Sequence, residues 1–231
     1  MEAIVLAGGL GTRLASVLHG LPKPMAPVAG RPFLEILFAQ LRHSGCTRVL
    51  LSVGHQHTAI QNHFGASFHG MALDYIVERA PLGTGGAVRL ALAEAREESV
   101  LVLNGDTFLD ADYAAMLRFH AAEGAAATLA VVHCGDVSRY GSVTIEDQHI
   151  VGFEEKGSSG PGFISAGTYV LARNLVWPPG LAEKFSIEQD FFVPEVASLR
   201  PAAFKVDGFF LDIGIPEDLD RAQTELAQFL R

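Results

Sequence analysis

The stretch from Ala3 to Leu14 limits the possible folds of this chain more than any other part of it. Its residues Ile4 to Leu6 form a short, wholly apolar run that ends at glycines, the pattern of a parallel strand covered on both faces. Gly8, Gly9 and Gly11 follow. Because glycine has no Cβ, a ligand can approach the backbone closely there and successive N–H groups can converge on an anion. The sequence therefore predicts a buried strand followed by a loop suited to phosphate groups.

The spacing of the loop separates the known kinds of glycine-rich loop. A P-loop needs Lys-Ser or Lys-Thr after its last glycine, where this chain has Thr12 and Arg13, and a dinucleotide fingerprint needs a third glycine where Leu14 stands. A plain surface turn after a strand remains an alternative. The sequence Pro22-Lys23-Pro24 favours a binding role, because prolines fix φ on both sides and hold the ammonium at a set reach.

Strands and helices are expected to alternate through the first half of the chain. The expected strands are residues 4–6, 49–53, 73–77 and 100–103, with helices beginning near residue 33, at 56–64 and at 87–96. This alternation predicts an α/β fold with a doubly wound, mostly parallel, Rossmann-like sheet.

The pattern changes from residue 126 onward. Strand-like runs at 128–132, 142–145, 150–154 and 164–170 are separated by turn residues, which predicts a small antiparallel extension. The dipeptide Asp207-Gly208 is a two-residue hairpin signal, and Pro216 is expected to begin the last helix. We expect one domain over residues 1–231, with an N-terminal part of about 1–125 and a C-terminal part of about 126–231.

Composition excludes several classes of function. The 231 residues are 49% hydrophobic and 19% charged, which suffices for one substantial core. The net charge of −9 argues against nucleic acid or an anionic membrane as partner. Cys46 and Cys134 lie far apart, so neither a zinc site nor a disulfide framework is expected. No basic segment precedes an apolar stretch, and no apolar run approaches the ~20 residues that span a bilayer. We expect a cytoplasmic protein.

Two acidic residues are expected to meet at one edge of the sheet. Asp106 comes directly after an apolar strand, and Asp212 ends another. Open α/β sheets bind ligands at the carboxyl ends of their strands. If the two strand ends are neighbours, the carboxylates can hold one Mg²⁺ while nucleotide phosphates complete its octahedron. Each residue alone could be a turn or cap residue, and their joint occurrence favours the metal site.

Several motifs together resemble the sugar-1-phosphate nucleotidylyltransferases over nearly the whole chain. They occur in the order that this family shows: residues 6–14, 22–24, Glu78 with 82–86, 104–106, 140–141, 154–156 and 212–218. Residues 23–28, 184–190 and 210–218 resemble in particular the branch that joins GTP to a heptose 1-phosphate. Ser165-Ala166-Gly167 departs from the Asn-Gly-Gly that relatives often carry, which leaves the identity of the sugar open.

The resemblance implies a reaction and a role for each matching residue. The sugar 1-phosphate oxygen would attack the α-phosphorus of the nucleotide and pyrophosphate would leave, so catalysis would consist of positioning and charge neutralisation. The implied catalytic residues are Arg13, Lys23 and Asp106, with Mg²⁺ on Asp106 and Asp212. The implied nucleotide-binding residues are Leu6, Ala7, Gly8, Gly9, Gly11, Thr12, Arg13, Glu78, Gly83 and Thr84. The implied sugar-phosphate-binding residues are Asn104, Gly141, Glu155, Lys156, Ser165 and Asp190.

Other functions remain open on the sequence. Within the same chemistry, the substrates could be mannose 1-phosphate with GTP, glucose 1-phosphate with dTTP or UTP, or N-acetylmuramate 1-phosphate with UTP. A non-catalytic nucleotide-sugar sensor or regulatory subunit need not keep both metal carboxylates, so Asp106 and Asp212 favour an enzyme. A dinucleotide-dependent oxidoreductase would need an acidic residue after the second strand, and Val53-Gly54-His55 offers none. We expect a monomer or a small homo-oligomer.

Overall fold

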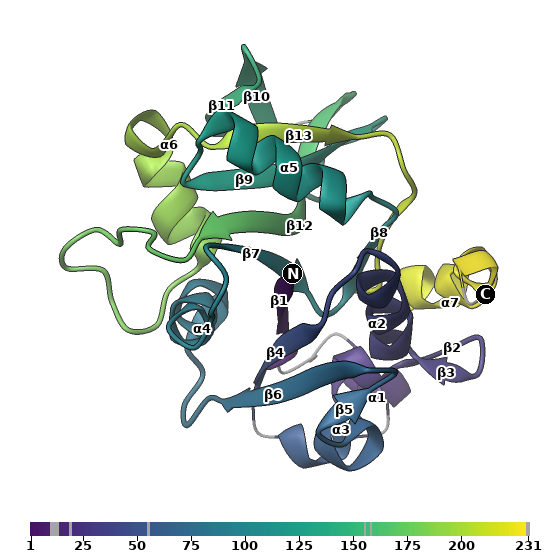
Figure 1. The fold of residues 1–231 in the computed structure, drawn as a ribbon. Helices are drawn as coiled ribbons and strands as arrows, with labels where there is room; N and C mark the ends of the chain where they lie inside the picture. Colours follow the sequence, from purple (N-terminus) through teal and green to yellow (C-terminus); the bar gives the residue numbers. More distant parts are fainter. Residues whose placement is uncertain (10–13, 19, 55, 155, 158, 230–231) are drawn as a thin grey trace.

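The computed structural model describes residues 1–9, 14–18, 20–54, 56–154, 156–157 and 159–229 (Figure 1). Within these residues, ten strands form one sheet in the order β10-β11-β13-β9-β12-β7-β1-β4-β6-β5. Its strands are β1 (Glu2–Leu6), β4 (Arg48–Val53), β5 (Ser67–Phe68), β6 (Met71–Val77), β7 (Ser99–Asn104), β9 (Ala127–Cys134), β10 (Ser142–Glu146), β11 (His149–Glu154), β12 (Gly162–Ala172) and β13 (Ala202–Val206). Two small ribbons pair β2 (Pro27–Val28) with β3 (Arg31–Pro32) and β8 (Thr107–Leu109) with β14 (Phe210–Asp212).

The first half of the chain forms the parallel part of the sheet. β1 pairs in parallel with β4 on one side and with β7 on the other, and β4 pairs in parallel with β6. β12 then runs antiparallel to both β7 and β9, so it joins the antiparallel extension to the parallel part. The predicted α/β architecture with an antiparallel extension is confirmed.

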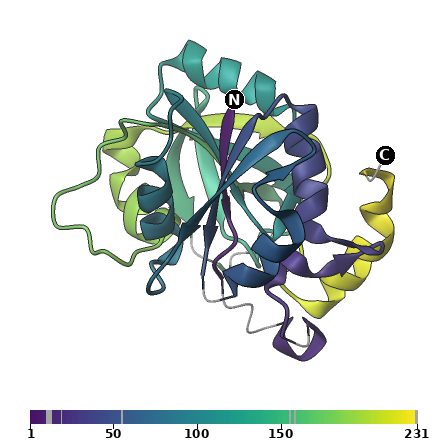
Figure 2. The same ribbon diagram turned by 60° about the horizontal axis from the view of Figure 1, so that its bottom comes forward.

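Helices lie on both faces of the sheet (Figures 1 and 2). They are α1 (Ala15–Leu18), α2 (Phe33–His43), α3 (His57–Phe64), α4 (Gly83–Leu92), α5 (Tyr113–Glu123), α6 (Val193–Leu199) and α7 (Pro216–Glu225), with shorter helical segments η2 (Lys23–Met25), η3 (Ile187–Phe192) and η4 (Ala227–Phe229). Side chains of α2, α3, α5 and α7 belong to one hydrophobic cluster, and those of α4 and η3 belong to a second. β1 contributes Ala3 and Val5 to the first cluster and Ile4 to the second, as alternation along a strand requires.

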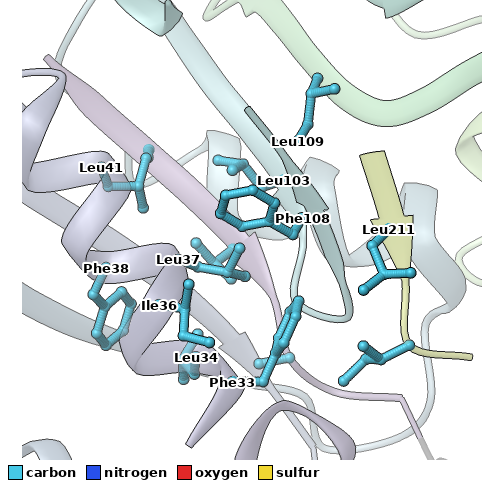
Figure 3. Packing of buried hydrophobic residues seen from close by; sticks show 14 of the residues in the cluster. Phe33, Leu34, Ile36, Leu37, Phe38, Leu41, Leu103, Phe108, Leu109 and Leu211 are labelled. Carbon is cyan, nitrogen blue, oxygen red and sulfur yellow. The ribbon is translucent and has the colours of Figure 1, made fainter. Parts of the chain in front are cut away.

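The packing of α2 fixes the strand ends that carry the predicted metal ligands. Phe33 and Leu37 are fully buried on the face of α2 that looks toward Leu103, Phe108 and Leu211 (Figure 3). Burying side chains of this size contributes roughly 1.5–3 kcal/mol each. Because these partners lie on β7, β8 and β14, one helix holds all three strands in place.

Helix α4 begins earlier than the sequence predicts. It starts at Gly83 rather than at residue 87, so a run of glycines forms its first turn. The reason is tertiary: a Cβ on Gly83 would lie 2.5 Å from the carbonyl oxygen of Phe185, and one on Gly85 would overlap the Phe185 ring. The glycines let a distant segment pack directly on the helix.

The two-residue hairpin expected at Asp207-Gly208 is wrong. β13 pairs with β9 and β11 in the main sheet, whereas β14 pairs with β8 in a separate ribbon. Gly208 carries the chain between them so close to the carbonyl of Asp110 that a Cβ would not fit. By contrast, β10 and β11 form a hairpin through Asp147 and Gln148, whose φ values of 43° and 64° are those of a type I′ turn. Among the described residues, no helix is long and apolar enough to cross a membrane.

Candidate active site

A cavity of about 300 Å³ opens at the carboxyl ends of β1, β6 and β7. Ligands of open α/β sheets bind at this edge. The lining residues come from the segment after β1, the segment around Lys23, the start of α4, the end of β7 and one distant loop: Leu6, Gly8, Gly9, Lys23, Pro24, Glu78, Pro81, Gly83, Thr84, Ala87, Asn104, Gly105, Asp106 and Lys184. Ala7 lies on the other side of the same loop and donates its N–H to the carbonyl of Ser52. Gly11, Thr12 and Arg13 lie outside the described residues.

Glu78 lines the cavity and is held there by two hydrogen bonds. Its Oε1 accepts a hydrogen bond from the Ser52 hydroxyl at 3.2 Å, and its Oε2 accepts one from the Leu82 N–H at 3.0 Å. A Cβ on Gly8 would lie 2.5 Å from that Oε1. The carboxylate therefore ties β4 to the start of α4, and a residue larger than glycine at position 8 would have to displace it. Both of its oxygens have protein partners, and the sequence did not predict these internal contacts.

Lys23 lies between the two predicted metal ligands. Pro22 has φ −66° and Pro24 is buried, so the lysine sits on a rigid turn. Its Nζ is 2.5 Å from Asp106 Oδ2 and 3.8 Å from Asp212 Oδ1, with 14% of its side chain exposed. The Lys23 ammonium group is therefore held at a defined place in the cavity, as the flanking prolines predict.

The two carboxylates meet because their strand ends are tied together. Asp212 pairs with Thr107 in the β14–β8 ribbon, and the Ile213 N–H donates to the Asp106 carbonyl at 3.0 Å. Asp212 Oδ1 is buried and, among the described residues, has no hydrogen-bond partner. Burial and then the charge of Asp106 raise the pKa of the Asp212 carboxyl, and Lys23 offsets this only partly.

This environment suits a cation. An unpartnered buried oxygen beside a second carboxylate is a hard oxygen donor set of the type that Mg²⁺ takes. The described residues contain no group of three or more His, Cys, Asp or Glu side chains arranged around a metal. A cation held by Asp106 and Asp212 would therefore take its other ligands from substrate or water, as Mg²⁺ commonly does.

A distant loop covers the start of α4. The Gly85 N–H donates to the Phe185 carbonyl at 2.9 Å, and the Ile187 N–H donates to the Thr84 hydroxyl at 3.0 Å. Arg89 donates to two carbonyls of this loop and lies over the Phe185 ring at 5.0 Å. This contact brings Lys184 into the cavity lining, a residue that the sequence reasoning did not single out.

The end of β7 lies between residues that are predicted to bind the nucleotide and residues that are predicted to bind the sugar 1-phosphate. The Gly105 N–H donates to the Leu6 carbonyl at 2.9 Å, and Asn104 lies against Gly167 of β12, which has φ +64°. A Cβ on Gly167 would overlap the Asn104 amide. The register of β12 on β9 shifts here, because Ser165 pairs with Val131 whereas Tyr169 pairs with Leu129. The residues Ser165-Ala166-Gly167, which differ from the Asn-Gly-Gly expected from the resemblance, thus lie in an irregular part of the strand beside Asn104.

Apart from Asn104, the predicted sugar-side residues that the structure describes do not line the cavity. Ser165 donates its hydroxyl to Glu188 Oε1 at 2.7 Å, and Asp190 accepts the Ser186 N–H at 2.7 Å. Gly141 has φ +81° in the turn before β10, and Lys156 is exposed in the turn after β11. Glu155 lies outside the described residues. Glu188 was missed, although it stands in a segment that the resemblance had already marked.

The fold and the cavity are those of an α/β protein that binds its ligand at the carboxyl edge of the sheet. The chain belongs to the nucleotidyl transferase family, whose model matches residues 2–228. Over the full length of both chains it is 42% identical to a D-glycero-α-D-manno-heptose 1-phosphate guanylyltransferase of Aneurinibacillus thermoaerophilus. It is 40% identical to the protein of that name from Campylobacter jejuni, over 94% of this chain and 96% of the other.

Solved structures agree with these similarities. The crystal structure of HddC from Yersinia pseudotuberculosis superposes with a TM-score of 0.85 at 37% identity, covering 96% of this chain and 97% of that one. The same protein complexed with GMP-PN gives a TM-score of 0.84.

Proposed function

We propose that this protein is a nucleotidylyltransferase that condenses GTP with D-glycero-α-D-manno-heptose 1-phosphate to give GDP-heptose and pyrophosphate. The relatives of 42% and 40% identity bear this name and match along nearly their whole length, which supports both substrates. The observation that carries the chemistry is the arrangement of Lys23 between Asp106, which like Lys23 lines the cavity, and Asp212. We further propose action in the cytoplasm, as a monomer or small homo-oligomer.

The residues divide the work of the reaction. The heptose 1-phosphate oxygen forms a bond to the α-phosphorus of GTP, and the bond from that phosphorus to the bridging oxygen of pyrophosphate breaks. Each terminal phosphate group brings roughly −1.5 to −2 charges, so the approach of the two substrates is opposed electrostatically. Lys23 is placed to offset this charge at the α-phosphate, and the amides of the loop after β1 can hold the departing phosphates. Arg13 is proposed to act with them.

Asp106 and Asp212 are proposed to hold one Mg²⁺. Bound there, the cation would neutralise charge that develops on the phosphoryl oxygens. On the proposed nucleotide side, Gly8 and Gly83 line the cavity, and Glu78 ties β4 to the Leu82 N–H at the start of α4. Geometry and charge thus supply the catalysis without a covalent intermediate.

A substrate panel tests the function. Purified protein is assayed for pyrophosphate release with GTP, UTP and dTTP, each against heptose, mannose, glucose and N-acetylmuramate 1-phosphates. GTP with the heptose 1-phosphate is expected to give the highest kcat/KM, with activity lost in EDTA and restored by Mg²⁺. Nucleotide binding without pyrophosphate release for any pair would instead identify a nucleotide-sugar sensor.

The role of Asp106 is tested by Asp106→Asn. Loss of a charge that acts in the transition state is expected to lower kcat by at least about 100-fold with an unchanged thermal unfolding midpoint. Asp110→Asn is the matched control, since Asp110 lies four residues further on and is exposed. Full activity of the Asp106 variant in Mg²⁺ would reject the assigned role.

A further inference from the structure

The segment η3, which follows the loop that covers α4, carries two acidic residues with different surroundings. Asp190 is exposed, and its Oδ2 accepts the Ser186 N–H at 2.7 Å, so it stabilises the start of η3. Glu188 is half-buried and turns toward β12, where its Oε1 accepts hydrogen bonds from the Ser165 hydroxyl at 2.7 Å and the Tyr169 hydroxyl at 2.8 Å. Only Glu188 of this pair therefore meets the strand that lies beside Asn104.

The surroundings of Glu188 extend to Asn104, a residue of the cavity lining. Ser165 and Tyr169 flank the register shift of β12, whose Gly167 lies against Asn104. The pKa of the fully buried Tyr169 hydroxyl is raised by burial first, then by the charge of Glu188, and also by the charge of Asp106. Glu188 thus shares one electrostatic environment with a carboxylate that lines the cavity.

One oxygen of Glu188 remains available. Oε1 accepts hydrogen bonds from both hydroxyls. Oε2 has no hydrogen-bond partner among the described residues, and Asp212 Oδ1 rather than this atom is the fully buried side-chain oxygen without a partner among them. An ionised carboxylate only accepts hydrogen bonds, so its complement is a ligand with hydroxyl donors. The segment winds as a π-helix, a form often found at functional sites.

We propose that Glu188 Oε2 accepts hydrogen bonds from the sugar hydroxyls of the sugar 1-phosphate, with Ser165 and Tyr169 as positioning residues that orient the carboxylate. This inference rests on the proposed function and replaces Asp190 with Glu188 as the acceptor in this segment. It also gives Ser165 a specific role, because its hydroxyl holds Glu188 at a position where relatives often carry asparagine.

Glu188→Gln tests the proposal through steady-state kinetics with the sugar 1-phosphate that the wild type prefers. Hydrogen bonds to charged groups are the strong ones, so kcat/KM for the sugar 1-phosphate is expected to fall roughly 10- to 100-fold while KM for GTP changes less than about threefold. Ser165→Ala and Tyr169→Phe are expected to raise the same sugar KM by smaller factors. The matched control is Glu195→Gln, which removes a carboxylate from the adjoining helix α6. Among the described side chains, this carboxylate accepts a hydrogen bond from the Ser198 hydroxyl.

The outcomes separate this inference from the function on which it rests. An inactive wild type across the whole substrate panel would reject the function itself. With an active wild type, a normal sugar KM in Glu188→Gln would overturn the inference, and so would a raised sugar KM in Asp190→Asn alone. Equal changes in the KM of both substrates would overturn it as well, because they would show a purely structural tie between η3 and β12. If the Glu188 variant does not fold, unchanged kinetics in both hydroxyl variants would overturn the inference.

Discussion

Lys23, Asp106 and Asp212 form a centre that, within the described part of the chain, joins one positive to two negative side chains at ion-pair distance. One ammonium faces two carboxylates, and the buried oxygen of Asp212 has no hydrogen bond within the described residues. Such a group stabilises the folded state less than a paired one, because burial without a partner costs free energy. The arrangement fits a site whose excess negative charge is offset by a bound cation.

This imbalance predicts a trade between stability and activity at Asp212. Since the pKa of Asp212 is raised in the folded protein, its ionised form at neutral pH lowers the free energy of unfolding. Asp212→Asn is therefore expected to raise that free energy by about 0.5–2 kcal/mol in EDTA while it abolishes turnover. Thermal unfolding with and without Mg²⁺ checks this, and only the wild type should gain stability from the cation. A variant that is less stable in EDTA would contradict it.

At the scale of elements, the glycine-rich start of α4 serves the loop that covers it. Phe185 packs on Gly85 and is also held by Trp177 and Arg89. Two backbone hydrogen bonds between the loop and Leu82 or Gly85 complete the contact. Because Lys184 lies between these anchors, its reach into the cavity depends on the contact as a whole.

Gly85→Ala is expected to displace this loop. The added Cβ would overlap the Phe185 ring, and overpacking of this kind costs typically about 1–3 kcal/mol. Hydrogen exchange of the Phe185 and Ile187 amides should accelerate, and KM for GTP should rise with the loss of Lys184 from the cavity. Leu90→Ala on the exposed side of the same helix is the control. Unchanged exchange in the glycine variant would show that the loop does not depend on this contact.

The same elements show what sequence alone can predict here. Asp106 and Asp212 were found because each follows an apolar strand, and strand ends in an α/β sheet share one edge. Lys184 was missed because its placement depends on contacts of its loop with Gly83–Gly86, about a hundred residues earlier in the chain. Glu188 was missed because its partners Ser165 and Tyr169 lie on β12. The false hairpin at Asp207-Gly208 has a similar origin, since the partner of β13 is β9 and no local signal specifies that pairing.

For the molecule as a whole, stability is expected to depend on pH through a group far from the cavity lining. His120 of α5 is 3% exposed, and its ring nitrogen contacts the Thr128 hydroxyl of β9 at 2.8 Å. Burial lowers its pKa below the usual value. Because its pKa is lowered, His120 binds a proton more readily in the unfolded chain than in the folded one. The neutral ring therefore makes its full contribution to the free energy of unfolding above about pH 6.5, and this contribution is lost as the pH falls below that value.

His120→Gln is expected to flatten this dependence. Between pH 7.5 and 5.5 the wild type should lose free energy of unfolding at up to about 1.4 kcal/mol per pH unit from this residue, and the variant should lose less. Urea unfolding at the two pH values measures the difference. Equal losses in both proteins would assign the dependence to other groups.

The end of β7 has a consequence for how substrates are chosen. Asn104 and Asp106 leave the same strand on either side of Gly105, whose amide is tied to Leu6. The Cα atoms of residues two positions apart in a chain, such as these, are separated by at most about 7 Å. A substrate that contacts both Asn104 and Asp106 must therefore match a fixed interval between them. Compounds that are too long or too short would not fit, even when each of their groups is acceptable. New sugar preferences would arise around this interval, at positions such as 165–167, while the interval itself stays constant.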